Sequence, residues 1–210
     1  MSVTSARNIK SIWLLTPLFG TIIFGCLYFV ATRFYPGGSQ VDKNSVGFSW
    51  AQNYWCNLLN ESAINGQPNA ARPIALTAMF VLCVTLTCFW YITPLQAGLQ
   101  KGIRLVIQIS GSLAMILAMF LFTNHHDAIV NAASAFGIVA TIGTFICINR
   151  LKWSKLLWLG IFNLALVVLN NILYYNEGLL IFLPVVQKIT FLFFLIWICL
   201  IDIELYKRSF

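Results

Sequence analysis

The sequence predicts an all-α membrane protein in which residues 1–210 form a single domain of six transmembrane helices. Hydrophobic residues make up 60% of the chain and charged residues only 9%, whereas a soluble domain carries about 25% charged residues. Six apolar runs are also long enough to cross a bilayer, which takes about 20 residues of helix. They cover about residues 11–32, 73–93, 102–122, 128–149, 156–175 and 179–203.

The first apolar run, residues 11–32, is interpreted as a helix because the apolar stretch of a signal peptide has only about 7–15 residues. It is followed by the longest polar segment, residues 33–72, in which SWAQNYWCNLLNES predicts a short amphipathic helix lying in the membrane interface. The polar side of this helix would carry Asn53, Asn57 and Glu61, while its tryptophan and tyrosine side chains would lie at headgroup level.

The next three runs carry helix signals at their ends or on one face. Pro73 suits the first turn of the second helix. Gly111 in the third helix and Gly137 in the fourth belong to small-residue faces that predict close helix packing. Asn124 and Asp127 form a capping arrangement at the start of the fourth helix.

The last two runs place polar groups inside the apolar part of the chain. Asn170 and Asn171 end the fifth helix, and Gln187 and Lys188 lie in the sixth. Lys188 is nine residues into its run, which corresponds to a depth of roughly 13 Å at 1.5 Å per residue. Pro184 is expected to kink the helix beside it. A charge at such a depth is a functional candidate by default, and the alternative is a lysine paired structurally with a neighbouring helix.

The basic residues predict that both termini are cytoplasmic, because lysine and arginine accumulate beside the inner ends of membrane helices. Nine of the 13 lie on the side of the termini: Arg7, Lys10, Lys101, Arg104, Arg150, Lys152, Lys155, Lys207 and Arg208. Three lie on the other side: Arg33, Lys43 and Arg72. An even number of spans agrees with this orientation. The expected location is the bacterial cytoplasmic, or inner, membrane.

The segment NHHD between the third and fourth helices contains the chain's two histidines, His125 and His126. The favoured interpretation is a helix cap with interfacial histidines, followed by a polar cavity and then by a metal site. A zinc site normally has at least three protein ligands, and here only Asp127 or Glu61 could supply the third. We therefore expect no metal and no cofactor. A hydrolase or transferase would use His126 with Asp127 or Glu61 as its candidate catalytic residues.

The net charge of +7 does not indicate nucleic-acid binding, because the basic residues lie between apolar runs and accompany no nucleic-acid motif. Five of the six cysteines fall inside apolar runs, and only Cys56 lies outside them. The expected partners are membrane lipids and a small-molecule or lipid ligand. The sequence does not determine whether the protein is an enzyme, nor does it determine the oligomeric state.

Four segments resemble an uncharacterised six-helix prokaryotic membrane family, catalogued as domain of unknown function 998. They are RFYPGG after the first helix, NLLNE, LFTNHHDAIVNAASAFG and LPVVQKITFLFFLIW, spread over about residues 30–200. The sequence departs from the family pattern in its long first loop and in Lys188, where the family more usually has arginine. The resemblance implies the six-helix fold and no particular activity.

Polar residues gather on the side opposite the termini, which predicts an outward-facing polar pocket. The leading hypothesis is that this pocket binds, senses or handles a small molecule or lipid at the outer leaflet. The alternatives are the hydrolase or transferase and a structural partner subunit. The residues expected to line the pocket are Asn53, Asn57, Glu61, Arg72, His125, His126, Asp127, Asn131, Asn170, Asn171, Gln187 and Lys188.

Overall fold

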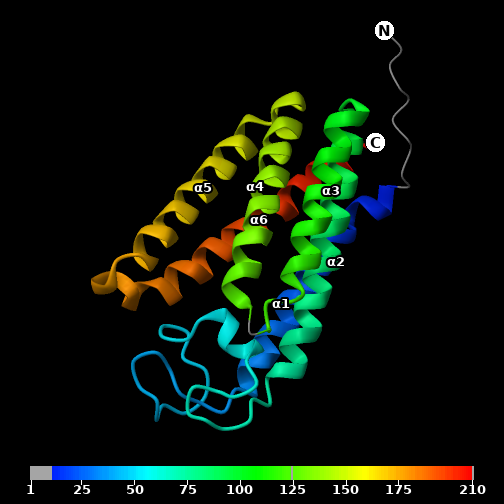
Figure 1. Cartoon of the computed structure of the whole chain (residues 1–210). Coiled ribbons are helices and arrows are strands. Elements are labelled where there is room, and N and C mark those ends of the chain that lie inside the picture. The colour runs from blue at the N-terminus through cyan, green and yellow to red at the C-terminus, as the bar shows by residue number, and fades with distance from the viewer. Residues whose placement is uncertain (1–10, 124, 210) are drawn as a thin grey trace. The chain divides into compact units, whose positions relative to one another are not determined.

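The computed structural model describes residues 11–123 and 125–209, without the side chains of Ser11, His126 and Asp127. Its regular elements in these ranges are helices, apart from two isolated β-bridges. Six helices are long and apolar enough to cross a membrane, which confirms the all-helical prediction. They are α1 Thr16–Arg33, α2 Arg72–Gln96, α3 Lys101–Ala118, α4 His126–Arg150, α5 Ser154–Tyr174 and α6 Leu183–Lys207 (Figure 1).

Short 3-10 helices extend two of the long helices at their N-terminal ends. Ser11–Leu15 (η1) leads into α1, and Glu177–Phe182 (η3) leads into α6. The second extension corrects the expectation that Pro184 kinks the helix, because it takes up the first residues of the sixth apolar run. Pro184 lies in the first turn of α6, where proline has no hydrogen bond to break, and it does not act as a mid-helix kink. Lys188 is five residues from the start of α6 and 11 residues from Glu177, where the candidate membrane span begins.

The contacts of the chain divide it into two compact units, and each is described by itself. Unit 1 comprises the described residues of Met1–Ile22, Phe80–Gly160 and Trp197–Phe210. Unit 2 comprises Ile23–Met79 and Ile161–Ile196. Helices α3 and α4 lie wholly in unit 1, and the long α1–α2 connection lies wholly in unit 2.

Close helix contacts in unit 1 depend on glycine at specific positions. A Cβ added to Gly111 of α3 would lie 2.7 Å from Trp90 of α2. The indole N–H of Trp90 donates to the Thr144 hydroxyl of α4 at 3.3 Å, so this side chain connects three helices. The packing role expected for Gly111 is therefore confirmed. The role expected for Gly137 is wrong, because an added Cβ there would meet nothing within 4 Å.

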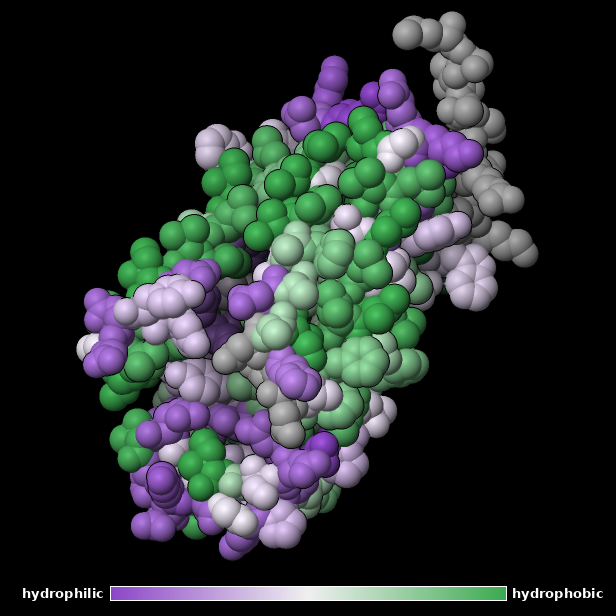
Figure 2. All heavy atoms as spheres, viewed as in Figure 1, coloured by the Kyte–Doolittle hydropathy of each residue, from purple (hydrophilic) through white to green (hydrophobic). Residues whose placement is uncertain are grey.

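The α1–α2 loop, residues 34–71, is an ordered structure at one end of α1 and α2 (Figure 1). Isolated antiparallel bridges join Gly37 to Val46 and Ser62 to Pro68. Gly38 adopts a φ of +82°, and a Cβ there would lie 2.4 Å from the backbone nitrogen of Asn65. Only glycine combines that backbone conformation with so close an approach. Figure 2 shows hydrophilic atoms gathered over this loop and hydrophobic atoms over the visible sides of the helices.

The amphipathic helix expected in this loop is not present as an α-helix. The segment contains a five-residue 3-10 helix, Trp55–Leu59 (η2). Asn53 and Asn57, expected on a polar outer side, are both buried. The physical reason is that their side-chain amides form hydrogen bonds with the loop backbone. On an exposed helical face the same amides would have bonded to water.

Candidate functional site

Buried asparagines hold the α1–α2 loop together from within. The Asn53 side-chain oxygen accepts the Ser49 N–H at 2.8 Å, and its amide donates to the Gly38 carbonyl at 2.8 Å. The Asn57 side-chain oxygen accepts the Tyr54 N–H at 2.7 Å. Both residues were predicted to line a pocket. In the structure their side chains hydrogen-bond to the backbone of the loop.

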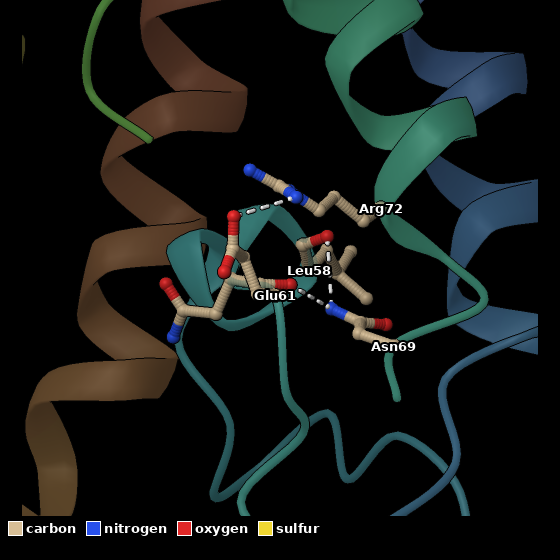
Figure 3. A network of polar contacts seen from close by, with 5 residues as sticks. Leu58, Glu61, Asn69 and Arg72 are labelled. Atoms are coloured by element: carbon tan, nitrogen blue, oxygen red, sulfur yellow. Dashed lines mark hydrogen bonds and ion pairs between the residues drawn. The ribbon is translucent and has the colours of Figure 1, made fainter. Parts of the chain in front are cut away.

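Asn69, which the sequence did not single out, is the most connected side chain in the loop (Figure 3). Its amide lies 3.1, 3.2 and 2.9 Å from the carbonyls of Asn57, Leu58 and Asn60. Its side-chain oxygen accepts the Ala71 N–H at 3.1 Å. Asn69 therefore ties the end of η2 to the residue before α2.

Glu61 and Arg72 form an ion pair between the loop and the first residue of α2, with 3.1 Å between Oε1 and Nη1 (Figure 3). The Glu61 side chain is 79% exposed and that of Arg72 is 27% exposed. Exposed pairs of this kind contribute about 0–1 kcal/mol to stability. The contact brings two of the predicted site residues together at the surface of unit 2.

Lys188 of α6 points at the α1–α2 loop. Its ammonium donates to the Asn53 carbonyl and, at 2.9 Å, to the Pro184 carbonyl one turn earlier in α6. The expectation that Lys188 has polar partners is confirmed. An ammonium has three N–H donors, and these two bonds leave one for a further acceptor.

Aromatic rings surround the Lys188 ammonium. Its nitrogen lies 5.7 Å from the Phe48 ring centroid and 5.9 Å from that of Trp55, within the range of cation–π attraction. Trp55 also contacts Tyr28 and Phe191, at centroid distances of 4.7 and 6.5 Å. Lys188, the Asn53 carbonyl, Phe48 and Trp55 are called the Lys188 cluster below.

Cys56 lies within electrostatic reach of this cluster. Burial raises the pKa of its thiol, and the Lys188 charge and local backbone N–H groups oppose that rise. Burial likewise raises the pKa of the neighbouring Tyr54 phenol. Both groups are therefore neutral at pH 7 and offer hydrogen-bonding capacity without charge.

Within the described part of the chain, three buried polar atoms of unit 2 have no hydrogen-bond partner: Trp55 Nε1, Gln187 Oε1 and Asn170 Oδ1. Gln187 and Thr190 are three residues apart on α6 and so share a face. The Asn170 amide donates to the Thr190 hydroxyl at 2.5 Å, which brings α5 to that face. An unpaired buried polar group costs about 1–3 kcal/mol, so a ligand or water that paired with these atoms would be stabilising. They are called the unpaired set below.

The remaining predicted residues do not join this arrangement in unit 2. His125 and Asn131 are exposed and belong to unit 1. His125 precedes α4 without capping it through its side chain. Asn171 is exposed and donates only to the Val167 carbonyl of its own helix at 2.9 Å. Asn124 and the side chains of His126 and Asp127 lie outside the described part of the chain.

Among the described residues, no group of three or more His, Cys, Asp or Glu side chains could hold a metal ion. Asp202 was not among the residues predicted from the sequence to be functional. This acid lies inside α6 with 1% exposure, and its Oδ2 has no partner. One carboxyl changes the average hydropathy of a long apolar run very little, so it is easily missed. An acidic residue inside a membrane helix nevertheless indicates a functional site.

No model of a known protein family matches the chain, and no curated protein or solved structure is significantly similar to it. The resemblance to the six-helix prokaryotic family receives no support from these comparisons and stays a hypothesis. The class of protein therefore follows from the fold. The six apolar helices fit a multi-pass membrane protein.

Proposed function

We propose that the protein binds a small polar molecule or a lipid headgroup at the Lys188 cluster and the unpaired set. The observation that carries this proposal is the presence in unit 2 of an unpaired buried donor and two unpaired buried acceptors, together with an ammonium that uses two of its three N–H groups among the described residues. Lys188 and the Trp55 indole would donate to the ligand. Gln187 and Asn170 would accept from it.

This combination selects a ligand that carries both acceptors and donors, such as a hydroxyl-bearing headgroup or a polar metabolite. The faces of Phe48 and Trp55 would cover the apolar part of such a ligand.

We further propose that the site faces outward and that both termini are cytoplasmic. The nine basic residues on the side of the termini support this orientation. The resemblance to a prokaryotic family supports the bacterial cytoplasmic membrane. The catalytic alternative has less support, because Glu61 is engaged with Arg72 at the surface.

Native mass spectrometry of the protein purified from its own membrane tests binding. We expect the wild type to carry an additional mass that Gln187→Leu and Lys188→Met both lose. Asn171→Leu is the matched control, because Asn171 is exposed and bonds only within its helix. An added mass in the range of a phospholipid would show that the ligand is a lipid. A smaller added mass would show that it is a small polar molecule. The absence of any adduct on the wild type, or equal adducts on all variants, would contradict the proposal.

A further inference from the structure

A buried carboxyl in unit 1 is independent of the site above. Asp202 lies on the face of α6 that also carries Ile198, Ile201 and Leu205. These positions follow helical spacing, and all four side chains are at most 3% exposed. Asp202 is the one ionisable residue among them, so an acid occupies a position where packing alone favours an apolar side chain.

No cation among the described residues neutralises this acid. The described ion pairs of the chain join Glu61 to Arg72 and Glu204 to Lys207, and Asp202 Oδ2 has no hydrogen-bond partner. The titratable group within its electrostatic reach is the Cys199 thiol, one turn earlier on α6. From α1, the uncharged Thr21 hydroxyl lies beside Cys199.

A buried carboxylate without a counter-ion is strongly disfavoured, and such a group takes up a proton instead. The surroundings of Asp202 do not suit a metal cation, because hard cations require several oxygen ligands. Of the described neighbours, Thr21 could supply one oxygen. A proton is the ligand that a single carboxyl can bind.

We propose that Asp202 is an intramembrane proton-binding site, which holds a proton when buried and exchanges it with the aqueous phase beside the C-terminal end of α6. The bond formed is the carboxyl O–H, and the proton comes from and returns to water. The short distance to the helix end supports exchange. Asp202 is five residues from Lys207, or about 8 Å along the axis.

Infrared spectroscopy of the protein in lipid nanodiscs over a pH series tests this site. We expect the wild type to show the C=O stretch of a neutral carboxylic acid, which shifts in D2O and converts reversibly to a carboxylate band as the pH rises. Asp202→Asn should lose this band. Glu204→Gln is the matched control and should keep it, because Glu204 is exposed and paired with Lys207 at 2.7 Å.

Spectra of the wild type and Asp202→Asn that coincide at every pH would overturn the proposal, as would a band that never converts while the protein stays folded. If Asp202→Asn does not fold, labelling of the wild type with dicyclohexylcarbodiimide replaces it. This apolar reagent attacks protonated carboxyls, so peptide mass spectrometry should find the adduct on Asp202. An unlabelled Asp202 would then overturn the proposal.

Discussion

At the scale of single residues, amide side chains hold together a loop that has little regular secondary structure. A buried asparagine amide can satisfy several backbone carbonyls that would otherwise be unpaired. The two N–H groups of the Asn69 amide are shared among three carbonyls, the Asn53 amide donates to the Gly38 carbonyl, and the Asn57 oxygen accepts the Tyr54 N–H. The order of the α1–α2 loop therefore depends on a few specific side chains.

Replacement of Asn69 by alanine should open this loop. The change leaves buried carbonyls without a donor, at a cost of about 1–3 kcal/mol. Cys56 is a natural reporter, because it is the cysteine outside the membrane spans and lies in η2. If opening of the loop limits the reaction, the rate at which an impermeant maleimide labels Cys56 should rise about tenfold for each 1.4 kcal/mol by which the free energy of opening is lowered.

Asn44→Ala is the control for this prediction. Asn44 is exposed in the same loop, and its side chain makes no hydrogen bond in the described part of the chain. Labelling should be followed by mass spectrometry of the Cys56 peptide at constant pH. Equal rates in Asn69→Ala and Asn44→Ala would show that Asn69 does not hold the loop closed.

Residue chemistry also explains which parts of the site were predictable. Lys188 was found because an isolated charge in an apolar run is conspicuous in sequence. Its partner, the Asn53 carbonyl, was not predictable, because every residue carries the same backbone group and Asn53 is 135 positions away. Asn69 resembles any other loop asparagine until the fold brings three carbonyls around it.

At the scale of helices, apolar length was sufficient to predict all six long elements. Their ends were less predictable. Residues 119–123 continue the apolar pattern of α3 but form turns, and Glu177–Phe182 begins the sixth span as a 3-10 helix. A hydropathy pattern reports burial or contact with lipid and does not distinguish these geometries.

Two glycines of unit 1, Gly111 and Gly137, should respond differently to replacement by alanine. Gly111→Ala should lower the melting temperature, because the new Cβ would lie 2.7 Å from Trp90 atoms that are fixed by packing; overpacking of this kind costs about 1–3 kcal/mol. Gly137→Ala should be neutral or stabilising by up to about 1 kcal/mol, because alanine favours the helix and nothing lies within 4 Å.

Thermal unfolding of both variants in the same detergent measures this difference. The comparison controls for the general effect of a glycine-to-alanine change in a membrane helix. Similar melting temperatures for the two variants would mean that the α2–α3 contact is not as close as the structure has it.

At the scale of the whole molecule, the orientation in the membrane decides which compartment the loop faces. Six spans return the C-terminus to the side of the N-terminus, and the bias of basic residues predicts that this side is the cytoplasm. A reporter enzyme that works only in the cytoplasm should be active when it is fused after Phe210. A reporter enzyme that works only on the outer side of the membrane should be active when it is inserted near Gln40. An external C-terminus would reverse the sidedness of the proposed site.

We propose that the α1–α2 loop and α6 together form a ligand site around Lys188. Cryo-electron microscopy of the protein in nanodiscs of its native lipids tests it most directly. We predict density for a bound molecule in contact with the free Lys188 N–H and with the unpaired set, Trp55, Gln187 and Asn170. A map in which these polar atoms pair with one another, or hold ordered water alone, would contradict the account and leave Lys188 with a purely structural role.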